Sequence, residues 1–343
     1  MKKEMKVVLL DAPTYRERGL QYGQQAKEEV DIAVEFYKKK FGDFPGWDKI
    51  TEFAKQFVEV SKEFFPEAIE ELEGIAEGSG HTVEELMVVN ARYEISNFDW
   101  KPECSTGVYH NQTTGKKYIF KNCDLGQEVK KHLVILHVVR PDGFRAIGVT
   151  EAGQLIRDGY TTNGIGMVNS AMYEMSDHAG VAVPGTVVRK KVWESKTFEE
   201  AANVTRNAFR TTSTNMLLAD KYGNAADFEC YPGGVDEVYC VNNMIGTGNR
   251  FTIHPEKNRG NTILEGIDRG LRLKELMTEA GDTIDEFKIM DILKDEYGLP
   301  KAICSKAGPG WETVYSIVVN MTDDKVYICL GRPSEGEFKE YTL

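Results

Sequence analysis

The sequence contains no apolar run long enough to cross a membrane. The only apolar run near its start is the stretch VVLL at 7–10. A membrane-spanning helix needs about 20 apolar residues, and the core of a secretory signal needs at least about seven. We therefore expect a cytoplasmic protein without a membrane partner.

Basic residues are too few for a general polyanion binder. The chain has 42 Lys and Arg against 54 Asp and Glu, which gives a formal net charge of −12. Attraction to phosphates requires clustered Lys and Arg, so we expect no nucleic acid partner. The short basic runs RKK at 189–191 and KK at 130–131 are interpreted as ordinary solvated faces.

Cysteine pairs with metal-binding spacing are missing as well. None of the six cysteines falls in a CxxC pair, so the sequence predicts no zinc site. Without a secretory signal a disulfide framework has little support, and a small buried hydrophobic side chain is the ordinary role for each cysteine. The six are Cys104, Cys123, Cys230, Cys240, Cys304 and Cys329.

Several standard catalytic motifs are also absent. The sequence has no GxSxG, no GxxxxGK[ST] and no HExxH. These absences argue against a nucleophile-elbow serine hydrolase, a P-loop NTPase and a zinc protease.

The sequence does contain a change of hydrophobic period at Cys104. In the first hundred residues, apolar side chains return every three or four positions, which predicts helices, including one over 81–95 with Thr82 as N-cap. From Cys104 onward, short β-rich segments are separated by turn signals such as TTGK and PDG, which indicates consecutive antiparallel strands. Helices then follow near 186–195 and 197–209, then strands, two more helices and terminal strands. This order predicts a single layered α+β domain over 1–343.

Two kinds of catalytic site could use Cys104 as the nucleophile. His254 follows Cys104 by about the spacing of papain-like proteases, but ECSTGVY lacks the glycine and second cysteine of that signature, and IHPEKN is typical of an exposed turn. The alternative is cleavage between Glu103 and Cys104. Cys104 would then carry its own α-amine as a base beside its thiol, which is the N-terminal nucleophile strategy.

A set of ordered motifs gives the sequence a specific resemblance. They are RERGLQYGQQAKEEV, ELEGIAEGSGHTVEELMVVNARYE, ECSTGVY, KNCD, TEAG, NGIGMVNS, TSTNMLLAD, GTGNRF and YICLGRP. In order and spacing the chain resembles the isopenicillin N acyltransferase family, the acyl-coenzyme A:6-aminopenicillanate acyltransferases. The resemblance implies a four-layer αββα N-terminal nucleophile hydrolase sandwich. It also implies self-cleavage into a helical leader, 1–103, and a catalytic part, 104–343, that stay associated.

The resemblance also assigns residue roles. Cys104 matches the nucleophile. Asp124 matches the acidic residue that orients the nucleophile and its new amine, and Asn249 matches the amide that donates to the oxyanion. A carboxylate beside an ammonium and a preorganised donor at a developing charge both make chemical sense. Asn122 is a further candidate for substrate binding.

Departures from the family pattern indicate a different pocket. The family carries Ser-Arg, suited to a substrate carboxylate, where this chain has Pro309 and Gly310. Another cation, Arg157 or Arg250, would then have to bind such a carboxylate, and β-lactam chemistry is not implied. Trp311 is a candidate for contact with an apolar or aromatic acyl group. The remaining departures are Glu103 in place of glycine and Cys123 in place of an aromatic residue.

The sequence thus predicts a cysteine amidohydrolase or acyltransferase that cleaves a linear amide of a small molecule or short peptide through a thioester. Nothing in the sequence decides between water and an amine as the acceptor. The sequence shows no evident basic site that would bind coenzyme A as acyl donor, so we expect no cofactor. We also expect no metal. Homo-oligomerisation is left open. The alternative is a non-catalytic or unprocessed binding protein that retains the fold.

Overall fold

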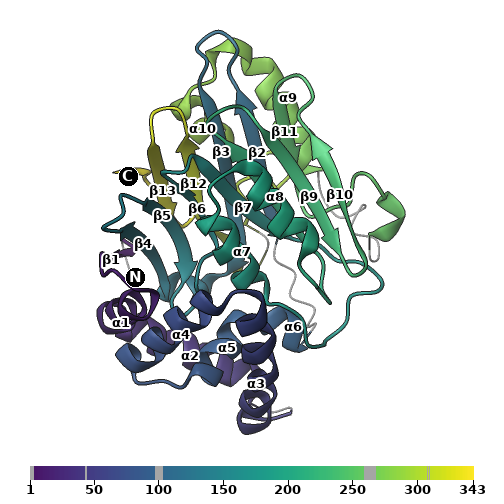
Figure 1. Ribbon diagram of the computed structural model, residues 1–343. Helices are drawn as coiled ribbons and strands as arrows, with labels where there is room; N and C mark the ends of the chain where they lie inside the picture. Colours follow the sequence, from purple (N-terminus) through teal and green to yellow (C-terminus); the bar gives the residue numbers. More distant parts are fainter. Residues whose placement is uncertain (1–3, 43–44, 97–102, 259–267, 307, 309) are drawn as a thin grey trace.

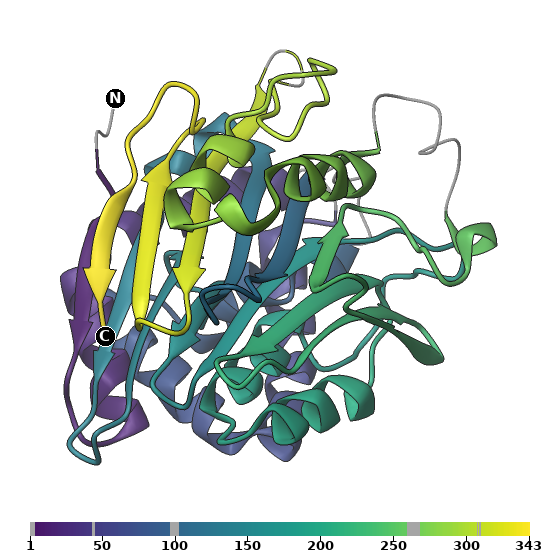
Figure 2. The same cartoon turned by 90° about the horizontal axis from the view of Figure 1, so that it is seen from above.

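Two β-sheets lie face to face in the computed structural model, with helices on both outer sides (Figures 1 and 2). The structure describes residues 4–42, 45–96, 103–258, 268–306, 308 and 310–343. The layers therefore run helix, sheet, sheet, helix, which confirms the predicted α+β class and αββα sandwich. No helix in these described ranges is long and apolar enough to cross a membrane.

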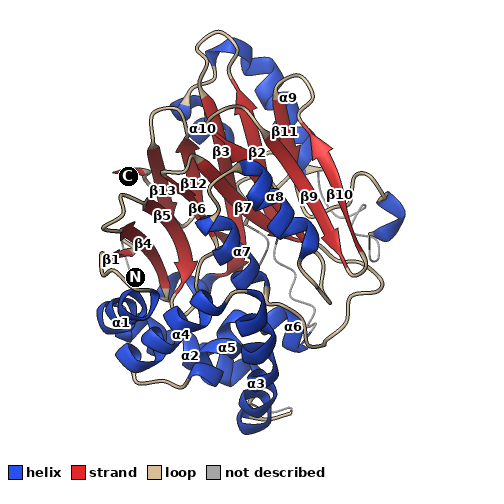
Figure 3. Ribbon diagram, viewed as in Figure 1, coloured by secondary structure: helices blue, strands red, loops and turns tan. Residues whose placement is uncertain are grey.

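The leader before Cys104 is helical apart from its first strand (Figure 3). Its helices are α1 (Tyr15–Gln25), α2 (Lys27–Phe41), α3 (Trp47–Phe64), α4 (Pro66–Ser79), α5 (Val83–Asn90) and α6 (Arg92–Ser96).

Local sequence signals explain several of these helix ends. Pro66 opens α4 because its missing N–H costs nothing in the first turn, and Gly80 ends α4 with a left-handed φ of 83°. Thr82 and Glu85 form the predicted capping box of α5. The single helix predicted over 81–95 is wrong, because it is divided at Ala91 into α5 and α6.

One sheet has eight described strands, in the order β1, β4, β5, β6, β7, β8, β9, β10. All neighbours pair antiparallel except β1 and β4, which are parallel. The strands are β1 (Lys6–Leu10), β4 (Leu133–Val139), β5 (Arg145–Glu151), β6 (Asp158–Thr161), β7 (Ile165–Ala171), β8 (Thr214–Asp220), β9 (Ala225–Tyr231) and β10 (Gly234–Tyr239).

The other sheet has six described strands, in the order β11, β2, β3, β12, β13, β14. The strands after Cys104 are therefore not one continuous series, since β2 and β3 belong to this sheet and β4–β7 to the eight-stranded one. The six strands are β11 (Met244–Thr247), β2 (Glu103–His110), β3 (Lys117–Gly126), β12 (Trp311–Asn320), β13 (Lys325–Leu330) and β14 (Lys339–Thr342).

Alternating side chains explain how each sheet is covered on both faces. In β4, Val134, Leu136 and Val138 pack under the leader helices, whereas Leu133 and Ile135 pack between the sheets. The helices α7 (Gly185–Glu194) and α8 (Phe198–Asn207) share the leader's side, and α9 (Arg269–Ala280) and α10 (Glu286–Leu293) cover the six-stranded sheet.

Candidate active site

Cys104 is the second residue of β2 and lies between the two sheets. Only 1% of its surface is exposed. The pairing of β2 with β3 places Cys104 directly opposite Cys123, and both side chains belong to the core between the sheets. The predicted nucleophile is therefore held on a paired strand and not on a loop.

Asn249 reaches Cys104 through the register of the neighbouring strand. Thr247 at the end of β11 pairs with Thr106, so continuing the antiparallel register by two residues brings Asn249 opposite Cys104. The Cys104 backbone N–H donates to Oδ1 of Asn249 at 2.6 Å, and Nδ2 of Asn249 donates to the Ala171 carbonyl at 2.6 Å. Asn249 thus holds the nitrogen that cleavage would turn into an α-amine.

Asp124 lies next to this pair on β3 and is bound by a buried arginine. Nη1 of Arg269 donates to Oδ2 of Asp124 at 2.7 Å, and the Thr313 hydroxyl donates to Oδ1 at 2.6 Å. Nη2 of Arg269 also donates to Oδ1 of Asn249 at 3.3 Å. One guanidinium therefore links the two predicted site residues.

Arg269 was missed at the sequence level. It is the first residue of α9, follows the N-cap Asp268, and is only 7% exposed. An arginine in the first turn of an amphipathic helix resembles a surface residue, and only the packing of α9 on β2 and β11 buries it.

The thiols of Cys104 and Cys123 form a hydrogen-bonded pair beside two cations. Burial opposes ionisation of Cys123, but the hydrogen bond from Cys104 and the charges of Lys121 and Arg157 outweigh it and lower the pKa of Cys123 to about 6. The hydrogen bond to Cys123 and burial raise the pKa of Cys104 well above its ordinary value.

Lys121 is the second residue that sequence reasoning missed. Its ammonium is fully buried, pairs with Asp158 Oδ2 at 2.7 Å, and lies 3.4 Å from Oδ1 of Asn169. Burial disfavours the charge, but Asp158 and the two thiols raise the pKa of Lys121, so it stays positively charged. A lysine two positions before Cys123 faces the same side of β3, and this spacing was the signal that could have revealed it.

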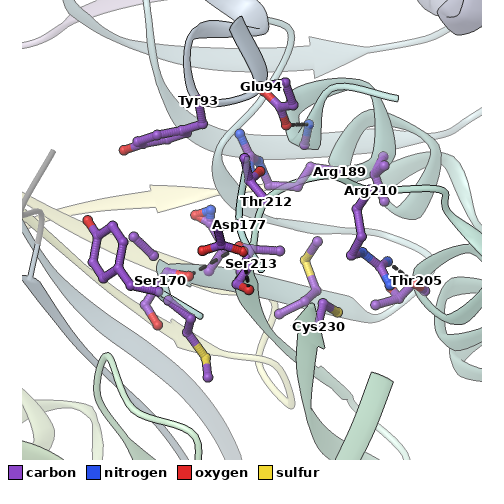
Figure 4. A pocket seen from close by; sticks show the side chains of 18 of the residues that line it. Tyr93, Glu94, Ser170, Asp177, Arg189, Thr205, Arg210, Thr212, Ser213 and Cys230 are labelled. Carbon is purple, nitrogen blue, oxygen red and sulfur yellow. Dashed lines mark hydrogen bonds between the residues drawn. The ribbon is translucent and has the colours of Figure 1, made fainter. Parts of the chain in front are cut away.

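One pocket is lined by Cys104 together with residues of β7, β8 and α7. Figure 4 shows this pocket from close by. Cys104, Arg157, Asn169 and Ala171 all line it. In Figure 4, Glu94 and Arg189 lie on one side of the pocket, Arg210 and Thr205 on another, and Asp177 and Ser213 between them. The predicted nucleophile Cys104 and the predicted substrate-binding residue Arg157 therefore share one cavity.

The other predicted substrate-binding residues lie outside the lining of this pocket. Asn122 donates to the Leu293 and Ile303 carbonyls and accepts from Ser316, so its amide is occupied by hydrogen bonds to neighbouring elements. Trp311 opens β12 opposite Gly126.

Three further positions from the sequence analysis are not among the described lining of this pocket, and one of them lies outside the described residues. Arg250 pairs with Asp268 at 3.3 Å. Pro309 lies outside the described residues, and of Glu103 only its backbone place in β2 is described.

The interpretation of 189–191 as a solvated face is wrong for two of its three residues. Arg189 is 7% exposed and Lys190 is 2% exposed. Lys190 pairs with Glu71 at 2.7 Å, under the leader helices. Because α7 is sandwiched between the leader and the eight-stranded sheet, a basic run that looks superficial in sequence is mostly internal.

No group of three or more His, Cys, Asp or Glu side chains within the described part of the chain is arranged to hold a metal ion.

Comparison with known proteins shows which proteins this chain resembles in sequence. The family model for acyl-coenzyme A:6-aminopenicillanic acid acyl-transferase matches residues 111–335, more than half of the chain. The acyl-coenzyme A:6-aminopenicillanic-acid-acyltransferase 40 kDa form of Emericella nidulans is 23% identical over 334 residues, covering 94% of this chain and 91% of that protein.

Solved structures also resemble parts of the chain. A Caenorhabditis elegans N-acylethanolamine-hydrolyzing acid amidase ortholog aligns with 16% identity and a TM-score of 0.48, covering 64% of this chain and 93% of its own. Penicillin V acylase from Agrobacterium tumefaciens aligns with 14% identity and a TM-score of 0.46, covering 66% and 83%.

Proposed function

Because the chain belongs to the acyl-coenzyme A:6-aminopenicillanic acid acyl-transferase family, we propose that it is a self-processing cysteine amidohydrolase or acyltransferase that acts on a linear amide. The observation that carries this proposal is the convergence of Asn249 and the Asp124–Arg269 pair on Cys104. A cysteine that only fills the core needs neither a side-chain amide that accepts a hydrogen bond from its backbone N–H nor a buried ion pair beside it.

The first proposed step cleaves the chain itself. The Cys104 thiol attacks the carbonyl carbon of Glu103, the C–N bond breaks, and the Cys104 nitrogen takes up the proton that the thiol gives up. Water then hydrolyses the Glu103 thioester, which frees the thiol and leaves a carboxylate on Glu103. Cys104 now carries both the nucleophile and an α-amine base.

The second step repeats this chemistry on a bound amide. The α-amine removes the thiol proton, the sulfur attacks the substrate carbonyl, and the amine product leaves with that proton. Asn249 stabilises the oxyanion through Nδ2, which already points at the pocket-lining residue Ala171. Water or a second amine resolves the thioester, so hydrolysis and acyl transfer share this intermediate.

Intact-mass measurement tests the proposal most directly. The purified protein should separate under denaturing conditions into fragments 1–103 and 104–343, and Cys104→Ala should remain one chain. A wild-type chain that stays whole after long incubation and hydrolyses no amide would favour the alternative, a binding protein that retains the fold.

A further inference from the structure

Arg189 presents an unpaired guanidinium to the pocket beside Cys104. It lines that pocket and is 7% exposed. Its Nε donates to the Ile156 carbonyl at 3.2 Å, and no carboxylate among the described residues comes within ion-pair distance of it. A buried charge without a countercharge is costly, so a site of this kind suits an anionic ligand.

Two other arginines strengthen the positive charge of this cavity. Arg157 lines it as well; its Nη1 pairs with Glu151 at 2.6 Å, and its Nε is buried without a hydrogen-bond partner in the described structure. Arg210 donates to the Thr205 carbonyl and has no carboxylate within ion-pair distance among the described residues. Burial and the nearby charge of Arg157 lower the pKa of Arg189 to about 10, which still leaves it charged near neutral pH. Three arginines thus line this cavity in a chain with a net charge of −12.

The carboxylates of the pocket are already engaged. Oε1 of Glu94 accepts the Gly185 N–H at 2.9 Å, and Asp177 accepts from the Ser213 hydroxyl at 2.6 Å and from the Glu174 N–H at 2.9 Å. Burial raises the pKa of both carboxyls.

Apolar side chains share the pocket with Cys104 and the arginines. These are Met172, Val183, Val188 and Met216. We propose that this cavity is an anion subsite in which Arg189 binds a carboxylate that an aliphatic spacer separates from the reacting amide. This inference rests on the proposed function for the reaction at Cys104, but the binding it describes does not.

Matched substrates test the subsite. Glutaryl-p-nitroanilide carries a carboxylate beyond a three-carbon spacer, its primary amide is a neutral isostere, and butanoyl-p-nitroanilide lacks the end group. A charge-assisted hydrogen-bonded pair contributes about 10- to 100-fold in kcat/KM, so wild type should prefer the carboxylate by that factor. Arg189→Gln should abolish this preference, which is measured within each protein as the ratio of kcat/KM for the glutaryl and butanoyl substrates.

Two variants control for indirect effects. Arg145→Gln removes an exposed arginine outside the pocket and should keep the full preference. Arg189→Lys keeps the charge but loses the planar two-pronged geometry, so an intermediate preference is expected. An unchanged preference in Arg189→Gln, verified as folded by its thermal transition, would exclude a carboxylate on the acyl side of the reacting amide.

A second substrate pair locates the carboxylate. N-butanoyl-4-aminobutyrate and its primary amide carry the end group on the amine side of the scissile bond. If Arg189 controls the preference only in this pair, the carboxylate belongs to the leaving amine. If Arg189 controls the preference only in the glutaryl pair, the carboxylate belongs to the acyl group. Absence of any Arg189-dependent preference in both pairs would refute the subsite.

Binding without turnover separates this inference from the proposed function. Glutaric acid monoanilide and its neutral primary amide are titrated by calorimetry into Cys104→Ala and into Cys104→Ala with Arg189→Gln. The acid should bind about 10- to 100-fold more tightly than the amide in the first protein and equally in the second. If no amide is ever hydrolysed but this difference holds, the proposed function fails and the subsite stands. Equal or absent binding of both probes would exclude an acyl-side carboxylate while leaving self-cleavage untouched, and the same result with N-butanoyl-4-aminobutyrate and its primary amide would refute the subsite.

Discussion

Asn249 faces the Cys104 nitrogen with its oxygen and the pocket wall at Ala171 with its Nδ2 group. One side chain can therefore hold the nucleophile's nitrogen and supply a donor toward a bound substrate. We expect Asn249→Ala to lower turnover by about 100- to 1000-fold with little change in fold, because a preorganised oxyanion donor acts on the transition state. Steady-state kinetics and intact mass measure turnover and maturation, and Asn203→Ala, on the exposed part of α8, is the control. Full activity in Asn249→Ala would mean that the residue only shapes its loop.

Asp124 contributes a negative charge beside the amine that the proposed cleavage would create. A nearby carboxylate favours the protonated amine, so its removal lowers the pKa of the amine from an ordinary value of about 7.7 to 8. In Asp124→Asn, the acidic limb of the turnover profile should therefore move to lower pH, with a loss of rate. The matched variant Arg269→Gln removes the cation bound to Asp124 and should move that limb to higher pH. Coincident profiles for the mature variants and wild type would remove Asp124 from the mechanism.

At the scale of elements, the leader depends on a close contact between α1 and α4. Gly19 and Gly23 on α1 face Gly74 and Gly78 on α4. A Cβ on Gly74 would lie 2.0 Å from the Arg16 carbonyl oxygen, and a Cβ on Gly19 would lie 2.0 Å from the Glu71 carbonyl oxygen. The helices pack backbone against backbone, which explains Gly19 and Gly23 in the motif RERGLQYGQQ and Gly74 and Gly78 in the motif ELEGIAEGSG.

Gly74→Ala should force these helices apart. The clash is with backbone, which cannot rotate away, so we expect a loss of at least about 1 to 3 kcal/mol in the free energy of unfolding. Denaturant unfolding measures this loss, and Glu70→Ala, an exposed position on the same helix, should be nearly neutral. Equal stability of Gly74→Ala and wild type would show that the contact can relax.

At the scale of the whole molecule, a buried ion cluster joins the leader to the catalytic part. Glu151 on β5 accepts from Tyr37 at 2.7 Å and pairs with Arg92 at 2.9 Å, both from the leader. It also pairs with Arg157 at 2.6 Å and contacts His132 at 3.2 Å. The cluster and the shared apolar core should keep fragments 1–103 and 104–343 together after cleavage.

This cluster predicts a pH dependence of stability. Burial opposes ionisation of Glu151, but the charge of Arg92, the hydrogen bond from His132 and the charge of Arg157 hold its pKa well below the ordinary range. A depressed carboxyl pKa stabilises the fold above the unfolded value of about 4.3, and this contribution is lost as pH falls toward the folded value.

Glu151→Gln should therefore cost about 3 to 5 kcal/mol near neutral pH, since it leaves buried arginines without their countercharge. The difference from wild type should shrink as pH falls below about 4. Denaturant unfolding across this range is the measurement, and Glu77→Gln, in an exposed pair with Arg16, is the control. A difference that does not vary with pH would mean that Glu151 acts through packing alone.

The sequence by itself determined the helical leader, the strands that begin at Cys104, the layered α+β class and the family. These properties follow from neighbouring residues, since hydrophobic period, caps and turn signals act over a few positions. The prediction of a single helix over 81–95 failed at Ala91, where α5 ends and α6 begins. The roles of Cys104, Asp124 and Asn249 remain predictions, now with a geometry in which to test them.

Only the tertiary structure decided what surrounds Cys104. The register of β2 with β11 brings Asn249 to its nitrogen, and packing of α9 buries Arg269 between Asp124 and Asn249. The position of α7 turns Arg189 from an apparent surface residue into part of the pocket. The physical reason is that burial and charge pairing depend on contacts between segments far apart in the chain, which no local pattern records.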